Sequence, residues 1–352
     1  MSGDAERLTV EADLDAVQRL FEEHHWSDGL PIIPPTSERV EAMLAGTRLP
    51  PGESLGPIPP RGGEATLENL AVNAVMAGCR PSAFPVIIAA VRAMLHHEFD
   101  LYGIQPTTHP VAPLVIVHGP VARALHVNGG AGVLGPGFPA NATIGRAVRL
   151  ILQNTGGAFP GEADMSTHGG PAKFTYCMTE NVAESPWPEF HTTRGFEPDE
   201  SAVTVFAGEA PHNVNDHESK TAVRLLDIVA DVMRALGHND WWVAEDGRCD
   251  VAVVLSPEHA KVVAGDGWGR LDVQRYLFET ARRRVSELTA GGMWGSKDWP
   301  SWMVGLAAKP DALIPVVRSA EDILVLVAGG AGKHSLVIPG YGAAQAVTEP
   351  VG

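Results

Sequence analysis

The residue whose type and neighbours most favour chemistry is Cys79, which stands between Gly78 and Arg80. Residues 66–77 have the apolar spacing of an amphipathic helix, and Gly78 is expected to end it because glycine readily adopts the left-handed conformation. Pro85 is expected to open a second helix. Cys79 would then lie near the unsatisfied N–H groups of a helix start, with a guanidinium beside it, and both favour the nucleophilic thiolate. The alternative is a buried cysteine that packs like a small apolar side chain.

A second thiol, Cys177, lies in a segment predicted to form a strand over residues 173–179. Alternation along the strand would place Cys177 on its more polar face, with Glu180 and Asn181 just beyond the strand end. His168 lies in the glycine-rich loop before the strand and has the chemistry of a proton carrier. This face is either a site or a solvated sheet surface with one incidental thiol. The opposite face is expected to form the core through Phe174, Tyr176 and Met178.

A glycine-rich loop over residues 128–139 leads to a predicted helix over residues 143–153, with Asn141 or Thr143 as its N-cap. The run from Gly130 to Gly135 fits a dinucleotide-binding fingerprint. That fingerprint requires a strand before the loop and a helix directly after it, which this sequence does not predict. Such a loop can instead hold a carboxylate or phosphate at the helix start, and a loop that only turns a corner is the alternative.

The segment from Gly329 to Ser335 invites comparison with the phosphate-binding P-loop. The match fails because Ala328 replaces the first glycine, His334 replaces the hydroxyl residue after Lys333, and a strand-like run follows instead of a helix. The sequence predicts either an anion-contacting turn, with Lys333 and His334 facing the ligand, or a plain surface turn.

The fourteen histidines include no pair with the spacing of a common metal motif such as HExxH. His212, Asp216 and His217 could together supply three ligands, and His109 and His118 flank a predicted strand. Scattered histidines more often are solvated or hydrogen-bonded in a core than bound to metal. We therefore expect no metal and no other cofactor, and a metal-dependent hydrolase is kept only as an alternative.

The overall charge and the termini restrict the class of protein. A formal charge of −16 argues against nucleic-acid partners, whose phosphates select basic faces. The polar N-terminus does not resemble a signal peptide, and no apolar run approaches the length of a membrane span. Three cysteines form no disulfide framework, and an odd number fits a reducing compartment. The sequence predicts a cytoplasmic protein with a small-molecule substrate.

The elements that must position these residues read as repeated strand–proline–helix units. Residues 113–118 form an apolar run that turns at a proline into a short helix, and residues 250–265 repeat this layout. Residues 323–332 form a third strand followed by a loop. Such repetition predicts a layered α/β fold, possibly of two related halves. The expected divisions are an N-terminal helix with a proline-rich wrap (1–65), a first α/β half with Cys79 and the glycine loop (66–200), and a second half (201–352).

Six of the eight tryptophans fall in the second half, several of them in the glycine- and proline-rich segment 291–302. Tryptophan buries a large area at low entropic cost, so this segment is predicted to be an interface loop or a lid. We expect it to support a homo-oligomer or to dock a partner subunit.

Several segments resemble signatures of an uncharacterised family of bacterial proteins. The resemblance covers the chain from about Trp26 onward, and its most specific part is the asparagine–arginine block 135–146. It implies a single unit of conserved length, and it carries no activity or residue roles with it. The segments are Asp28–Thr36, Asn73–Cys79, Gly135–Arg146, Ser185–Trp187 and Ala328–Ser335.

Together these features predict a thiol-dependent lyase or hydrolase acting on a small, anionic substrate. Cys79 would be the nucleophilic or acid–base thiol. The alternatives are a thiol redox protein that uses Cys79 and Cys177, the metal-dependent hydrolase, and a non-catalytic subunit of a complex. The other predicted catalytic residues are His109, His168, Cys177 and Glu180. The predicted substrate-binding residues are Arg80, Gly130, Gly132, Asn141, Thr143, Arg146, Asn181, Lys333 and His334.

Overall fold

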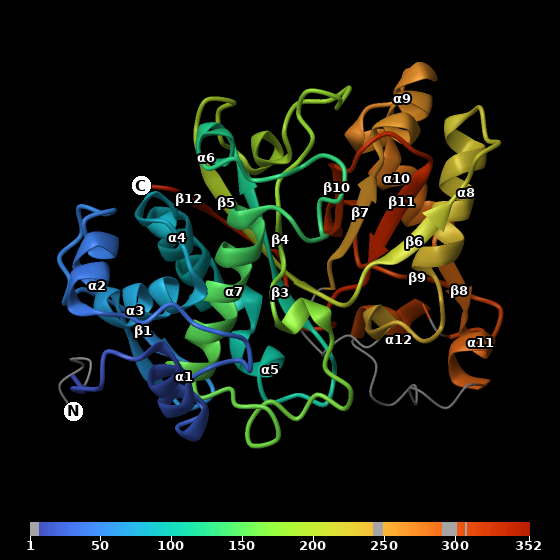
Figure 1. Cartoon of the computed structure of the whole chain (residues 1–352). Coiled ribbons are helices and arrows are strands. Elements are labelled where there is room, and N and C mark those ends of the chain that lie inside the picture. Colours follow the sequence, from blue (N-terminus) through green and yellow to red (C-terminus); the bar gives the residue numbers. More distant parts are fainter. Residues whose placement is uncertain (1–6, 242–248, 291–300, 307) are drawn as a thin grey trace.

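The computed structural model describes residues 7–241, 249–290, 301–306 and 308–352. Within them the chain has the α/β character that the sequence predicts, with helices packed on two mixed sheets (Figure 1). In this described part no helix combines the length and apolar character that a membrane span requires. The N-terminal elements that lead to the sheets are α1 (Leu14–Glu23), α2 (Ser37–Leu44), β1 (Ser54–Ile58), β2 (Gly63–Thr66), α3 (Leu67–Ala77), α4 (Phe84–Leu95) and α5 (Leu101–Ile104).

The first four-stranded sheet has the order β12-β5-β3-β4. Its central strand β3 is buried along its whole length, pairs in parallel with β4 and pairs antiparallel with β5. The strand β12 then pairs antiparallel with the other side of β5. The strands are β3 (Ala112–His118), β4 (Cys177–Met178), β5 (Ala202–Gly208) and β12 (Val347–Pro350).

The second four-stranded sheet has the order β10-β7-β11-β6 and repeats this pattern. Its strand β7 pairs in parallel with β10 and antiparallel with β11, and β6 pairs antiparallel with the other side of β11. The strands are β6 (His212–Asn215), β7 (Val251–Leu255), β10 (Ile323–Val327) and β11 (His334–Ile338).

The chain crosses between the two sheets twice. The strand β6 follows β5 along the chain but pairs with β11 in the second sheet, and β12 follows β11 but pairs with β5 in the first sheet. The equivalent strands β3 and β7 each turn at a proline into a helix, α6 (Pro120–Ala124) and α9 (Pro257–Gly265). The repeated strand–proline–helix layout is therefore part of a topology that the two four-stranded sheets share.

The two sheets pack face to face, and helices cover their outer faces. Alternate residues of β3, such as Val115 and Ile116, enter the helix-side core and the core between the sheets, respectively. The strands are therefore buried on both faces, which explains their unbroken apolar runs. The outer helices include α3, α4 and α7 (Pro139–Asn154) on the first sheet, and α8 (Ala222–Met233) and α10 (Arg270–Thr280) on the second (Figure 1). The remaining short elements are β8 (Arg282–Arg284), α11 (Val285–Ala290), α12 (Ser301–Leu306) and β9 (Leu313–Pro315).

The predicted helix before Cys79 is confirmed. It begins after Thr66, whose hydroxyl accepts the Asn69 N–H at 3.2 Å, and it ends at Gly78 with a φ of +86°. The glycine is needed there because other residues are strained at positive φ. The predicted N-caps of α7 are wrong. That helix begins at Pro139, so Asn141 and Thr143 lie inside its first turns.

The predicted strand over residues 173–179 is wrong in extent. Its predicted core face is correct for Tyr176 and Met178, which are buried between the sheets, and wrong for Phe174. Residues 171–173 form a turn of 3-10 helix, and only Cys177–Met178 pair with β3. Phe174 is 47 % exposed, whereas Cys177 is buried against the helix-side core. Because β4 lies between helices and a second sheet, neither of its faces is the solvated one that alternation implied.

Candidate functional site

Segments that are far apart in the sequence meet at Cys79. The Cys79 thiol donates a hydrogen bond to the Thr143 carbonyl oxygen at 3.2 Å, and Thr143 belongs to α7. Arg146, one turn further along this helix, makes a bidentate ion pair with Asp28, with both N···O distances at 2.8 Å. Three of the five family-like segments therefore converge here. The guanidinium predicted to bind substrate is engaged by a carboxylate of the chain itself.

The surroundings of Cys79 favour the protonated thiol, contrary to the thiolate that the sequence predicts. Burial raises the pKa of Cys79 to about 12, and the nearby charge of Arg146 only partly opposes this effect. The thiol points to the carbonyl of Thr143, and the Cys79 N–H is bonded to the Ala74 carbonyl at the end of α3. Arg80 lies next to Cys79 as an exposed side chain. Desolvation therefore outweighs the helix-start effect that the spacing suggested.

Cys177 lies close enough to Cys79 for the two side chains to interact electrostatically. Burial is the main cause of the raised pKa of Cys177, and a negative charge on Cys79 would raise it further. Both residues are free thiols in the structure. The structure thus brings these two predicted residues together, and both favour their neutral forms.

Asn141 holds the glycine-rich loop in place. Its Oδ1 accepts the Asn128 N–H at 2.7 Å, and its Nδ2 donates to the carbonyl oxygens of Asn128, Val133 and Cys177. The Gly130 N–H is bonded to the Asn128 side chain at 2.9 Å, and the Thr143 hydroxyl donates to the Pro139 carbonyl at 2.8 Å. These predicted anion-binding donors have partners within the protein, so they shape the loop.

The glycine-rich loop meets the loop after β10 at the seam between the sheets. The Gly329 N–H donates to the Gly129 carbonyl at 2.8 Å, and a Cβ on Gly330 would lie 2.6 Å from the Cβ of Ala131. The Asn181 side chain completes this junction by donating to the Gly329 carbonyl at 2.9 Å. Gly132, in the same loop, has a φ of +69°. The two glycine loops are therefore in direct backbone contact, and Asn181 holds this contact in place.

Lys333 and His334 point away from this junction, toward β6 and the turn after it. Lys333 Nζ donates to the His217 carbonyl at 2.7 Å, and His334 Nδ1 lies 3.2 Å from Asn213 Oδ1. Neither residue faces Cys79 or the glycine-rich loop through any described contact. His334 thus contacts β6 itself, and Lys333 binds the turn that follows β6.

Glu180 is the predicted residue with the most unusual environment. Its Oε1 accepts hydrogen bonds from Arg270 Nη2 at 2.8 Å and from the Val327 N–H at 3.3 Å, and its Oε2 accepts one from the Phe190 N–H. His118 Nδ1, at the end of β3, lies 3.9 Å from the same Oε2. The carboxyl ends of β3, β4 and β10 meet at this point, which is where ligands bind in many α/β sheets.

Glu180, His118, His191 and Arg270 form what we call the seam cluster. The imidazole rings of His118 and His191 stack with their centroids 5.4 Å apart, and His118 Nε2 lies 2.9 Å from the Thr204 hydroxyl oxygen. All four side chains are buried. Among the residues that the structure describes, three buried nitrogens of this cluster have no hydrogen-bond partner: His118 Nδ1, His191 Nδ1 and Arg270 Nε.

Burial favours the neutral forms of Glu180 and His118 in the seam cluster. It raises the pKa of Glu180 to about 7, although the charge of Arg270 opposes this shift. It also lowers the pKa of His118 well below its usual range, an effect that the charges of His191 and Arg270 reinforce. The site therefore holds a carboxyl group that gains or loses a proton near neutral pH beside a neutral imidazole. This is the combination that general acid–base catalysis uses.

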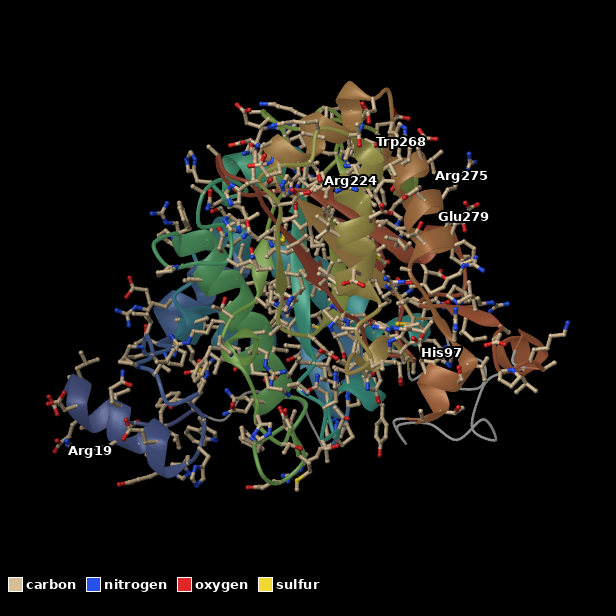
Figure 2. All side chains as sticks on the ribbon, turned by 90° about the vertical axis from the view of Figure 1, so that its right-hand side faces the viewer. Arg19, His97, Arg224, Trp268, Arg275 and Glu279 are labelled. Atoms are coloured by element: carbon tan, nitrogen blue, oxygen red, sulfur yellow. The ribbon has the colours of Figure 1, made fainter. Side chains whose placement is uncertain are left out.

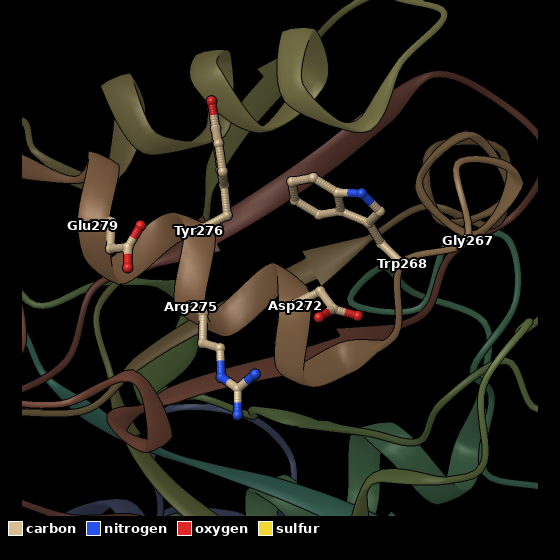
Figure 3. Close-up of a pocket in the computed structure, with 6 residues that line it drawn as sticks. All are labelled: Gly267, Trp268, Asp272, Arg275, Tyr276 and Glu279. Carbon is tan, nitrogen blue, oxygen red and sulfur yellow. The ribbon is translucent and has the colours of Figure 1, made fainter.

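Trp187 covers the Arg270 side of the cluster. The Arg270 guanidinium carbon lies 5.9 Å from the centroid of the Trp187 ring, and the Trp187 indole N–H donates to the Trp268 carbonyl at 3.2 Å. Trp268 in turn lines a shallow pocket of about 340 Å³ along α10, with Tyr276 and Arg275 (Figure 3). In Figure 2 the labelled residues Trp268, Arg275 and Glu279 follow one outer edge of the second half. The open surface along α10 thus combines the aromatic Trp268 and Tyr276 with the charged Asp272, Arg275 and Glu279.

The two predicted proton carriers do not belong to the seam cluster. His109 precedes β3 and therefore lies at the opposite end of this strand from His118, where its Nε2 is 2.7 Å from Glu209 Oε1. His168 is exposed in the loop before Pro171. In the described ranges, no three or more His, Cys, Asp or Glu side chains are arranged to hold a metal ion. His212, Asp216 and His217 therefore do not form the three-ligand group that the sequence suggested. The tryptophan segment 291–300 lies outside the described residues.

Sequence reasoning missed three members of the seam cluster. His118 had a signal, since it is a polar residue that closes a buried apolar strand before a Gly-Pro turn. His191 and Arg270 had none, because their neighbours in the sequence carry no motif. The chain matches no protein-family model, and no curated protein or solved structure matches it either. The resemblance to the bacterial family therefore stays an expectation from the five segments alone.

Proposed function

We propose that the protein is an enzyme of lyase or hydrolase type that moves a proton on a small anionic substrate at the seam cluster. Glu180 is the proton carrier, because its pKa near 7 lets it both give and take a proton at neutral pH. Arg270 is the anion-binding group. The observation that carries the proposal is the set of three unpartnered buried nitrogens around Glu180. Arg270 Nε is a donor for a substrate oxygen, whereas the Nδ1 atoms of His118 and His191 donate or accept according to the tautomer of each ring.

Substrate access in this proposal involves the segment between β4 and Phe190. Val182 is 41 % exposed in this segment, and Trp187 rests on the Arg270 guanidinium. Displacement of Trp187 would open the guanidinium to a carboxylate from the side of the pocket on α10. The bound carboxylate would then accept hydrogen bonds from Arg270, and a C–H proton of the substrate would pass to Glu180. Trp187 is the last residue of Ser185–Trp187, one of the family-like segments, so this segment would control access to Arg270 in the proposal.

The experiment that tests this function is hydrogen exchange in small carboxylates. Pyruvate, oxaloacetate and malonate are incubated with the protein in D₂O, and the loss of their C–H signals is followed by ¹H NMR. The expected result is protein-dependent exchange with at least one of them, which Glu180→Gln abolishes and Glu184→Gln leaves unchanged. Glu184 is a matched control because it is exposed in the same segment. Exchange no faster than in buffer, or equal rates for both variants, would refute the proposal.

A second candidate keeps the thiol chemistry that the sequence suggests. It is favoured by the convergence of Asp28, Cys79 and Arg146 and by the partial exposure of Cys79. In this candidate Cys79 acts as a nucleophile or proton donor, or forms a redox pair with Cys177. Mass spectrometry after mild oxidation distinguishes the redox pair from the other two roles of Cys79. A bridge between the two cysteines supports redox chemistry, and free thiols at both positions exclude it.

The cellular compartment is inferred from the cysteines. We infer that the protein works in the cytoplasm, because its three cysteines are free thiols and their odd number suits a reducing compartment. A homo-oligomer, or a complex with a partner subunit, also remains part of the proposal. Size-exclusion chromatography with light scattering tests it, and a monomer at micromolar concentration would contradict it.

A further inference from the structure

A second cavity lies far from the seam cluster, among the N-terminal helices. It has a volume of about 1240 Å³ and lies between α1, the proline-rich segment, α2 and α3, and we call it the N-terminal groove. These helices form the outer edge of the first half (Figure 1). The volume exceeds the 300–1,000 Å³ that is usual for small-molecule sites. The function proposed above makes no use of it.

The sides of the groove are apolar. Leu14 and Val10 line it from the α1 side although they are 60 % and 45 % exposed, and Val40, Leu44 and Met76 line it from α2 and α3. Exposed apolar side chains that gather in one concave surface indicate a binding site more often than singly scattered ones do. The walls therefore suit the hydrocarbon part of a ligand.

The floor of the groove carries a hydrogen-bond acceptor without a donor. Asn154 Nδ2 donates to the Trp26 carbonyl at 2.9 Å and to Asn73 Oδ1 at 2.8 Å, and these bonds fix the orientation of the amide. Within the described part of the chain, the buried Asn154 Oδ1 has no hydrogen-bond partner. Asn73 belongs to the same segment as Cys79, so this segment contributes to the groove through its asparagine. Asn154 Oδ1 is covered in the structure, and a ligand that reaches it must bring an N–H or O–H group.

The charges around the groove are mostly negative. Its described lining includes five carboxylates and two guanidinium groups. Glu64 and Glu68 line the groove from β2 and α3, and the Glu64 carboxylate accepts a hydrogen bond from the Ser54 hydroxyl. Gly63, next to Glu64, packs closely on the Thr155 carbonyl beside Asn154, since a Cβ there would lie 2.0 Å from that oxygen. A negative rim above an unpaired acceptor attracts a cation that can also donate hydrogen bonds.

We propose that the N-terminal groove binds a small amphipathic amine. Its apolar body lies between α1 and α2, and its ammonium group donates to Asn154 Oδ1 near Glu64 and Glu68. An ammonium group has three donors and no acceptor, which matches an orphaned acceptor beside carboxylates. A carboxylate ligand would bring a second acceptor to this floor and meet the negative rim. The proposal therefore separates ligands of equal length by the charge of their head group.

Isothermal titration calorimetry with two ten-carbon probes tests the proposal. Decylamine and decanoate are titrated separately into the intact protein at pH 7, below their micelle concentrations. We expect decylamine to bind at least about tenfold more tightly than decanoate, which corresponds to 1.4 kcal/mol. The double variant Glu64→Gln/Glu68→Gln should weaken decylamine binding by about three- to tenfold, because partly exposed ion pairs are individually weak.

A matched double variant controls for the overall charge. Glu22→Gln/Glu38→Gln removes two exposed carboxylates from α1 and α2 that do not line the groove. It should leave decylamine affinity within about twofold of the original. The proposal is overturned by decanoate binding as tightly as decylamine, by equal weakening in both double variants, or by no heat of binding with decylamine. Circular dichroism confirms that each variant is folded before titration.

Discussion

Arg270 at the start of α10 and Glu180 directly after β4 form an ion pair with an N···O distance of 2.8 Å, although ninety positions separate them. The pair joins the two halves of the chain at the point where the sheets meet. Its side chains are 7 % and 1 % exposed. A buried ion pair of this kind contributes little net stability compared with apolar packing, because desolvation of both charges offsets their attraction. Its position beside two histidines whose Nδ1 atoms lack hydrogen-bond partners fits a functional role better than a stabilising one.

The first prediction concerns the pH dependence of stability. The pKa of Glu180 is raised from 4.5 to about 7 in the folded protein, so the folded state binds this proton more tightly than the unfolded state does. The favourable contribution of the protonated carboxyl is complete below pH 4.5 and is lost as the pH rises to about 7. Relative to the original protein, Glu180→Gln should therefore gain up to about 3 kcal/mol of unfolding free energy between pH 4.5 and 8.

Urea unfolding at several pH values measures this difference. The variant Glu184→Gln is the control, because its carboxylate is exposed and pairs with Lys261 at the surface. Its difference from the original protein should change little over the same range. A Glu180→Gln difference that stays constant from pH 4.5 to 8 would show that Glu180 does not titrate there.

The second prediction concerns the reactivity of Cys79. A thiol with a pKa of about 12 is almost fully protonated at pH 7.5, whereas a free cysteine has a pKa near 8.5. Alkylation of Cys79 by iodoacetamide should be slower by about a thousandfold than in the urea-unfolded chain, and its rate should keep rising up to pH 9. Peptide mass spectrometry measures the labelling. A rate plateau near pH 7 would instead reveal a stabilised thiolate and restore the thiol mechanism.

The third prediction concerns the Asp28–Arg146 pair. Both side chains are mostly buried, at 8 % and 14 % exposure, and their bidentate geometry couples the proline-rich wrap to α7. A double-mutant cycle with Asp28→Asn and Arg146→Gln should give a coupling energy of about 1–2 kcal/mol in urea unfolding. Additive effects would mean that the two side chains act independently, which would leave Arg146 available to a substrate.

The fourth prediction concerns the contact between the two glycine loops. Gly330→Ala should destabilise the fold by about 1–3 kcal/mol, because the new Cβ would lie 2.6 Å from the Cβ of Ala131. Ala131→Gly in the same chain should recover only part of the loss, because the Ala131 Cα would still lie 2.9 Å from the new Cβ. Gly237→Ala is the control, since a Cβ there meets nothing within 4 Å. Thermal unfolding measures all three, and a loss in Gly330→Ala no larger than that in Gly237→Ala would place the two loops apart.

Much of the fold follows from local sequence. The runs that form β3, β7 and β10 are apolar throughout because each strand is covered on both faces. By contrast, β6 and β12 are short and largely polar, and each pairs with a strand that is more than a hundred residues away in the sequence. Periodicity cannot predict such strands, because their pairing depends on the completed topology.

The candidate site was only partly predictable for the same reason. Glu180 follows an apolar segment, so its position at a strand end could be read from the sequence. Its unusual pKa depends on burial by elements from the other half, including Arg270. The thiolate predicted for Cys79 failed because a nearby helix start matters less than the desolvation that α7 imposes. Residue types were visible in the sequence, and their environments were not.

The most direct test of the central claim is a carboxyl titration by NMR. With ¹³C-labelled glutamate, the side-chain carboxyl signal that disappears in Glu180→Gln is assigned to Glu180 and followed from pH 4 to 9. A titration midpoint near pH 7 is the predicted result. A midpoint at or below 4.5, the ordinary value for glutamate, would show a permanently ionised partner of Arg270 and contradict the acid–base role of the seam cluster.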